Sequence, residues 1–174
     1  MTRTKARRGW AVVAVAAAVV AAFTVDQATK AWALSALSNG EIIPLVPTLW
    51  LELFFNPGVA FGIGADVGAP LVVGLVLVIA ALFGWICVRL VRGDGVIGTV
   101  FLAVAAGGAA GNLWDRISRA EDGPLTGHVV DFIAVDWFAV FNVADIFTTT
   151  GIALWALTSA IRARQVDQPA PAEG

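Results

Sequence analysis

Two aspartates in the stretch 127–145, GHVVDFIAVDWFAVFNVAD, are the residues of this chain best suited to chemistry. Asp131 and Asp145 lie among apolar residues, where an ionised carboxylate is costly unless it has partners, reaches water or has a raised pKa. Two aspartates that share a proton can hydrolyse an amide, one as general base on water and the other, protonated, polarising the carbonyl. Spacing alone does not show that the two meet, because the segment WFAVF must fold back between them.

Both aspartates also have a plain structural explanation. Asn142 and Asp145 have the spacing of a helix capping box, and an acid in a first turn favours the helix dipole. Asp131 could be an ordinary loop aspartate, although its neighbours in VVDFI are bulky and apolar, which a solvated loop does not need. We expect Asp131 to be only partly wetted.

Three further polar segments have structural explanations of the same kind. The segment NLWDR, residues 112–116, could be the end of a span with a local ion pair between Asp115 and Arg116. Asn56-Pro57-Gly58 could be only a turn. Asp26 and Lys30 lie one helical turn apart and can pair with each other.

The sequence lacks the residues that zinc, cysteine and serine hydrolases need. The only histidine is His128, there is no HExxH motif, and the only cysteine, Cys87, lies near the opposite face of the predicted bundle. No serine lies beside a suitable base. We therefore expect no metal, no cofactor and no thiol nucleophile.

The composition is that of an integral membrane protein. Hydrophobic residues make up 59% of the 174 residues, charged residues 14%, and the mean hydropathy is +0.83. Long apolar runs predict four transmembrane helices in one membrane-embedded domain, residues 1–164. The predicted spans are about 9–29, 67–89, 95–114 and 142–161. The first run resembles a secretory signal peptide, but further spans follow it and it ends in DQATK, so we interpret it as a retained span.

The segments between the spans predict a sheet and a loop on the outer membrane surface. Prolines 44, 47 and 57 break any long helix, and LVPTLWLELFF favours short strands, so we predict a small β-sheet cradle at about 40–63. The polar segment after Trp114 predicts an outer loop over 115–141. The Pro- and Ala-rich tail 165–174 predicts disorder.

Basic residues predict the orientation. The N-terminus, the RLVRG loop and the C-terminal RAR hold most of the eleven Lys and Arg residues, which predicts that both termini are cytoplasmic. Polar candidates then collect at the outer ends of the spans, and the span interiors hold essentially no ionisable group. A pump or transporter would place a charge or a broken helix near the midplane, and the predicted spans of this sequence have neither.

Five sequence blocks resemble the signatures of the lipoprotein signal peptidases, the signal peptidase II family. The blocks are DQATK at 26–30, NPGVAFG at 56–62, GGAAGNLWDR at 107–116, GHVVDF at 127–132 and FNVAD at 141–145. The resemblance covers nearly all of residues 10–161. One departure is SRAEDGPLT between Arg116 and Gly127, which is longer and more acidic than is typical, so the path of that loop stays open.

The resemblance implies an aspartyl endopeptidase of the bacterial inner membrane, and we expect it to be a monomer. It implies removal of signal peptides from prolipoproteins, with the cut just before a diacylglyceryl-modified cysteine, and inhibition by globomycin. It implies Asp131 and Asp145 as the catalytic dyad; Asn56, Gly58, Asn112, Arg116 and Asn142 as substrate-binding residues; and Asp26, Lys30 and Asp115 as support for the site. Membrane lipids are implied partners, and nucleic acids are not. The rival hypothesis is a small transporter or lipid-binding scaffold that uses the outer carboxylates for ion or headgroup contact.

Overall fold

The computed structural model describes residues 2–58, 69–120, 123 and 126–166, with eight regular elements. The helices are α1 (Thr2–Ala36), α2 (Ala69–Arg92), α3 (Val96–Ser118) and α4 (Val143–Val166). The strands are β1 (Ile43–Val46), β2 (Leu49–Asn56), β3 (Val129–Val135) and β4 (Phe138–Phe141). The predicted strand residues 59–63 and the predicted disorder of 167–174 lie outside the described residues.

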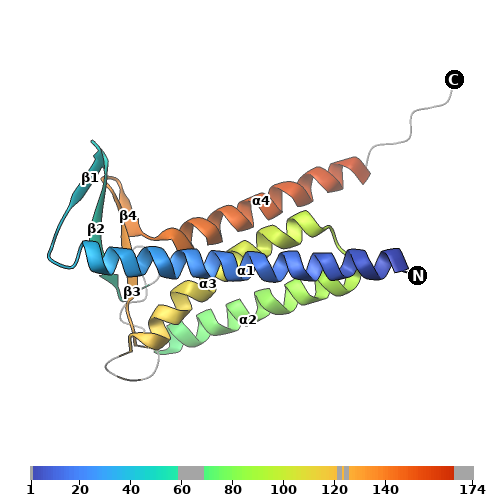
Figure 1. The fold of residues 1–174 in the computed structure, drawn as a ribbon, viewed down its shortest axis with the longest axis horizontal. Helices are drawn as coiled ribbons and strands as arrows, with labels where there is room; N and C mark the ends of the chain where they lie inside the picture. The colour runs from blue at the N-terminus through green and yellow to red at the C-terminus, as the bar shows by residue number, and fades with distance from the viewer. Residues whose placement is uncertain (1, 59–68, 121–122, 124–125, 167–174) are drawn as a thin grey trace.

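Four helices in the described part of the chain are long and apolar enough to cross a membrane, which confirms the predicted four-span fold. They run side by side, and all four strands gather at one end of the bundle, called the sheet end here (Figure 1). The helices α1 and α3 are longer than the apolar runs from which the spans were predicted. α1 continues through Asp26 and Lys30 because these charges pair, and α3 continues to Ser118. Asp115 and Arg116 are therefore helical, not part of a loop.

The sheet is larger than predicted. Its order is β1-β2-β3-β4, all neighbours antiparallel, and only β1 and β2 come from the expected segment. The prediction of a loop over 115–141 was wrong, because this segment also holds the end of α3 and both β3 and β4. β3 is an interior strand whose residues are mostly buried on both faces, so it lacks the apolar–polar alternation of a half-exposed strand.

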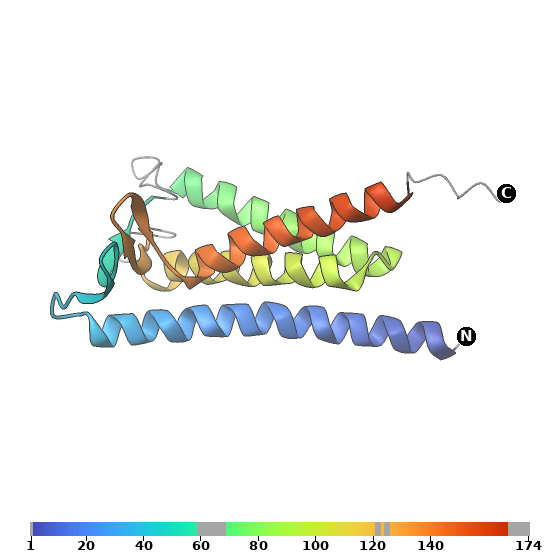
Figure 2. The same cartoon turned by 90° about the horizontal axis from the view of Figure 1, so that it is seen from above.

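The central helix of the bundle is α3, which lies between α1 on one side and α2 and α4 on the other (Figure 2). Glycines allow these close approaches. A Cβ added at Gly107 would lie 2.5 Å from the carbonyl oxygen of Val19 in α1, and one added at Gly108 would lie 2.5 Å from that of Ala144 in α4. Small residues at helix contacts let backbones approach closely in membranes, and here they bring three helix ends to the site.

Candidate active site

Asp131 and Asp145 come together at the sheet end although different elements carry them. Asp131 lies in β3 opposite Phe54 of β2 and is 1% exposed. Asp145 lies in the first turn of α4. Both line one cavity of about 470 Å³ between α2, α3, α4 and the strands β3 and β4. The fold-back of the intervening segment, which spacing alone left open, is the β3–β4 hairpin.

Asparagine side chains hold both oxygens of Asp131. The Asn56 amide donates to Oδ2 at 2.8 Å, and the Asn142 amide donates to Oδ1 at 2.6 Å. These partners explain how a carboxyl group is kept inside the protein, since a buried polar group without a partner is costly. The interpretation of Asp131 as an ordinary loop residue is wrong.

Asp145 has both a capping role and a place in the cavity. Its backbone N–H donates to Asn142 Oδ1, and its Oδ2 accepts from the Asn142 backbone N–H, each at 3.1 Å. This reciprocal pair is the predicted capping box. The other carboxylate oxygen, Oδ1, accepts from Asn112 Nδ2 at 2.9 Å. Capping thus fixes the carboxyl group at the cavity wall.

Burial, with a smaller contribution from the nearby charge of Asp145, raises the pKa of Asp131 to about 6. The hydrogen bonds from Asn56 and Asn142 and the charge of Lys30 act in the opposite direction. A carboxyl group with this pKa exchanges a proton readily near neutral pH, as general acid–base catalysis requires.

Stability should report this raised pKa directly. Because the folded pKa exceeds the unfolded value of 3.8, the protonated form favours folding, and this contribution is lost as pH rises through the folded pKa. We expect the free energy of unfolding of the wild type, relative to Asp131→Asn, to fall by about 2–3 kcal/mol between about pH 4 and pH 7. Thermal unfolding in detergent across this range measures it, and parallel pH curves for the two proteins would contradict the raised pKa.

Asp26, Lys30 and Asp115 form a buried charge cluster beside the two aspartates. Lys30 Nζ lies 2.9 Å from Asp26 Oδ2 and 2.9 Å from Asp115 Oδ2, and all three side chains are fully buried. The predicted Asp26–Lys30 pair is therefore confirmed. Asp115 pairs with Lys30 and Arg119, so a local ion pair with Arg116 does not describe its role.

Asp26 and Asp115 also accept hydrogen bonds from the backbone next to Asp145 and Asp131, respectively. Asp26 Oδ1 accepts from the N–H of Ala144, the residue before Asp145, at 3.1 Å. Asp115 Oδ2 accepts from the N–H of Val130, the residue before Asp131, at 3.2 Å. Charged hydrogen bonds are stronger than neutral ones, so the cluster ties α1 and α3 to the two segments that carry the aspartates.

Arg116 points its guanidinium at the turn that follows β2. It donates to the backbone carbonyls of Pro57, at 3.3 Å, and Gly58. The Gly58 N–H donates to Asn56 Oδ1 at 3.0 Å, which is the Asx turn expected of Asn-Pro-Gly. Asn56 therefore both forms the turn and contacts Asp131, so the two explanations of this residue are compatible.

The apolar wall of the cavity is what sequence reasoning missed. α2 contributes Leu75, Val78 and Ile79, and the β4 strand lines the wall with residues 138–141. These side chains resemble lipid-facing residues in the sequence, so no local signal separates a cavity wall from a lipid-exposed surface.

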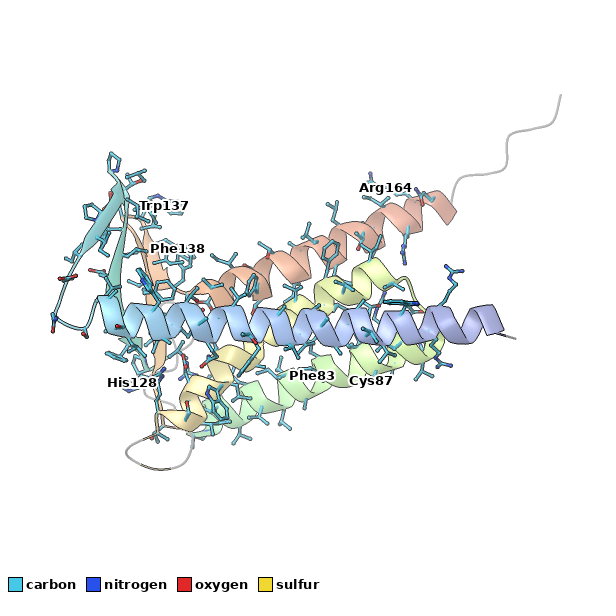
Figure 3. The ribbon with its side chains drawn as sticks, viewed as in Figure 1. Phe83, Cys87, His128, Trp137, Phe138 and Arg164 are labelled. Atoms are coloured by element: carbon cyan, nitrogen blue, oxygen red, sulfur yellow. The ribbon has the colours of Figure 1, made fainter. Side chains whose placement is uncertain are left out.

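Among the cavity-lining residues that the structure describes there is neither a cysteine nor a histidine. Cys87 lies on α2 away from the sheet end, and His128 lies at the sheet end but is exposed (Figure 3). Within residues 2–58, 69–120, 123 and 126–166, no group of three or more His, Cys, Asp and Glu side chains could hold a metal ion.

Comparison with known proteins gives consistent matches over most of the chain. The family model described as "Signal peptidase (SPase) II" matches residues 18–161. The lipoprotein signal peptidase of Bifidobacterium longum subsp. infantis is 43% identical over 148 residues, which cover 84% of this chain and 78% of the relative. That of Mycobacterium avium is 38% identical over 154 residues, or 88% of this chain and 80% of the relative.

Solved structures support the fold. One described as a bacterial membrane enzyme, at 2.3 Å resolution, superposes with a TM-score of 0.67 and 21% identity, over 95% of each chain. A second of the same description, at 1.9 Å, gives 0.63 and 24% identity over 86% of this chain and 92% of the other. Because the family match spans both aspartates and the relatives match along most of their own length, the chain belongs to the signal peptidase II family, the lipoprotein signal peptidases.

Proposed function

We propose that this protein is an aspartic endopeptidase that removes signal peptides from diacylglyceryl-modified prolipoproteins, cutting before the lipidated cysteine. The observation that carries the proposal is that Asp131 and Asp145 line one cavity and both bind Asn142, one through its side-chain amide and the other through its backbone N–H. The charge of Asp145 also acts on the Asp131 carboxyl group, and two carboxyl groups that interact in this way titrate as a coupled pair.

The reaction needs one ionised and one protonated carboxyl group. The ionised aspartate takes a proton from water as the water oxygen bonds to the scissile carbonyl carbon, and the protonated one donates to the carbonyl oxygen. The C–N bond then breaks as the C=O bond re-forms: the leaving amine takes the proton that the base had accepted, and a hydroxyl proton of the tetrahedral intermediate returns to the other aspartate. A pKa of about 6 for Asp131 supports this division of roles near neutral pH.

The walls of the cavity support a substrate with a lipid beside the scissile bond. Its polar end holds the two aspartates with Asn56, Asn112 and Arg116, while the rest is lined by apolar residues of α2, α4 and β4. An apolar signal helix and diacylglyceryl chains would pack on that wall, and amide and guanidinium donors would bind the peptide backbone. We assign substrate binding to Asn56, Gly58, Asn112 and Arg116, which line the cavity. Asn142 is fully buried and does not line it, so we assign it the task of holding the two aspartates in place of the predicted contact with substrate. Globomycin would compete for the same cavity.

A cleavage assay tests the function. Purified protein in detergent is incubated with a diacylglyceryl-modified prolipoprotein, and we expect a shift of the product to lower mass that globomycin blocks. The same precursor without its lipid is the matched control and should stay uncut. Binding of the lipidated precursor without any cleavage would favour a lipid-binding scaffold instead.

We place the protein in the bacterial cytoplasmic membrane as a monomer without cofactor, with both termini in the cytoplasm and the sheet end outside. Figure 1 supports this arrangement, since α1 begins and α4 ends at the end opposite the sheet. That end also carries Arg8, Arg89 and Arg162, as expected of cytoplasmic ends.

Thiol labelling tests this topology. In a Cys87→Ala background, Asn39→Cys lies between α1 and β1 at the sheet end, and Asp94→Cys lies between α2 and α3 at the other end. A membrane-impermeant maleimide should label intact cells or spheroplasts at position 39 and not at position 94, and both positions after lysis. Labelling of position 94 alone in intact cells would reverse the orientation.

A further inference from the structure

We propose that Lys30 is a positioning residue that orients the Asn112 side-chain amide so that its NH₂ group faces Asp145. The inference rests on the proposed function, and it assigns a specific task to a lysine that does not line the cavity. Lys30 would thus set the direction of the hydrogen bonds that reach both aspartates.

The ammonium group of Lys30 is saturated by three acceptors. Its Nζ lies 2.9 Å from Asp26 Oδ2, 2.9 Å from Asp115 Oδ2 and 2.7 Å from Asn112 Oδ1. A lysine has three N–H donors and no acceptor, so only the oxygen of the Asn112 amide can face it. Because Lys30 is fully buried, no water replaces this contact.

The remaining atoms of Asn112 then have no freedom. Its Oδ1 also accepts from Asn142 Nδ2 at 3.0 Å, which fills both lone pairs, and its Nδ2 donates to Asp145 Oδ1 at 2.9 Å. A rotation of the amide by half a turn would place nitrogen against the lysine and oxygen against the carboxylate. With Lys30 present, both of those contacts are repulsive.

The orientation of the Asn112 amide also affects the hydrogen bonds to Asp131, through Asn142. The Asn142 amide nitrogen donates one hydrogen bond to Asn112 Oδ1 and another to Asp131 Oδ1, and the Asn142 amide oxygen accepts one from the Asp145 backbone N–H. If Asn112 turned its NH₂ group toward Asn142, two donors would face each other. The orientation that Lys30 imposes on the Asn112 amide therefore determines which groups donate hydrogen bonds to Asp131 and Asp145.

A structural role alone would make different predictions. If Lys30 only balanced the charges of Asp26 and Asp115, its loss would lower stability and leave the catalytic rate of the folded protein unchanged. If it orients Asn112, its loss lowers kcat, and the loss disappears once Asn112 has no amide to orient. A double-mutant cycle on kcat separates the two, since coupling between sites appears as non-additivity.

The experiment measures kcat, KM and thermal unfolding on the lipidated precursor for Lys30→Met, Asn112→Ala and the double variant. We expect Lys30→Met to lower kcat about 10- to 100-fold, as loss of a charged hydrogen bond would, with little change in KM. In the Asn112→Ala background the same change should alter kcat by less than about twofold. Arg119→Ala is the matched control, because Arg119 pairs with Asp115 and not with the Asn112 amide, and it should keep wild-type kcat.

Lys30→Met leaves two buried carboxylates without their cation, so Lys30→Met combined with Asp115→Asn restores the net charge that Asp26, Lys30 and Asp115 have together in the wild type. We expect this variant to recover thermal stability but not kcat. A kcat within about twofold of wild type in either folded variant, or an equal loss with and without Asn112, would overturn the inference. These outcomes differ from failure of the proposed function, in which the wild-type protein itself would leave the lipidated precursor uncut.

Discussion

Asp131→Asn and Asp145→Asn should each lower cleavage of a lipidated precursor by about 10³-fold or more while the protein still inserts in the membrane. The reason is that an amide can neither take a proton from water nor give one to a carbonyl. Initial rates of precursor cleavage, with protein amounts matched by folded fraction, measure the effect. Asparagine is close to aspartate in size, so the contacts disturbed are the hydrogen bonds that the aspartates accept from Asn56, Asn112 and Asn142.

Asp136→Asn is the matched control for both substitutions. Asp136 is exposed in the turn between β3 and β4 and does not line the cavity, so the same chemical change there should leave the rate within about twofold of wild type. Near-wild-type cleavage by either dyad variant would remove that aspartate from the mechanism, whatever the result for the other.

Gly108→Ala should have the second largest effect, through the position of Asp145. An added Cβ would lie 2.5 Å from the carbonyl oxygen of Ala144 and 3.0 Å from Phe147 Cβ, so α4 must move away from α3. We expect a loss of about 1–3 kcal/mol in stability from overpacking, and about a 10²-fold loss of cleavage because Asp145 moves with the helix. Thermal unfolding and the cleavage rate report the two effects.

Gly74→Ala provides the comparison for Gly108→Ala. Gly74 lies in α2 with no atom within 4 Å of an added Cβ, and alanine favours a helix interior over glycine by about 1 kcal/mol. This variant should be as stable and as active as the wild type, or slightly more stable. Equal behaviour of the two variants would show that close packing of α3 against α4 does not hold the site.

Sequence patterns predicted the elements whose signals are local. The four spans follow from apolar length, the Asp26–Lys30 pair from a four-residue spacing, and the Asn142–Asp145 cap from a three-residue spacing. Each signal is contained within one helix or one helix end. The sequence blocks also marked residues that the fold does bring together around the cavity.

What could not be predicted depends on contacts between distant segments. β3 looked like a loop because an interior strand between β2 and β4 needs apolar residues on both faces and so has no alternating pattern. Apart from Arg119, the partners of Asp115 lie on α1 and β3, and neither of these is visible from its neighbours in NLWDR. Arg116 likewise binds a turn 58 residues away in the sequence.

The four-residue spacing of Asp26 and Lys30 also has a consequence for how the protein is made. α1 leaves the ribosome long before Asn112 and Asp115 are synthesised. Lys30 therefore enters the membrane without these two partners. Within α1 alone, Asp26 already neutralises it across one helical turn, at 2.9 Å. The part of α1 that follows Arg8 can therefore be inserted with its only two charges paired, and α3 completes the cluster afterwards.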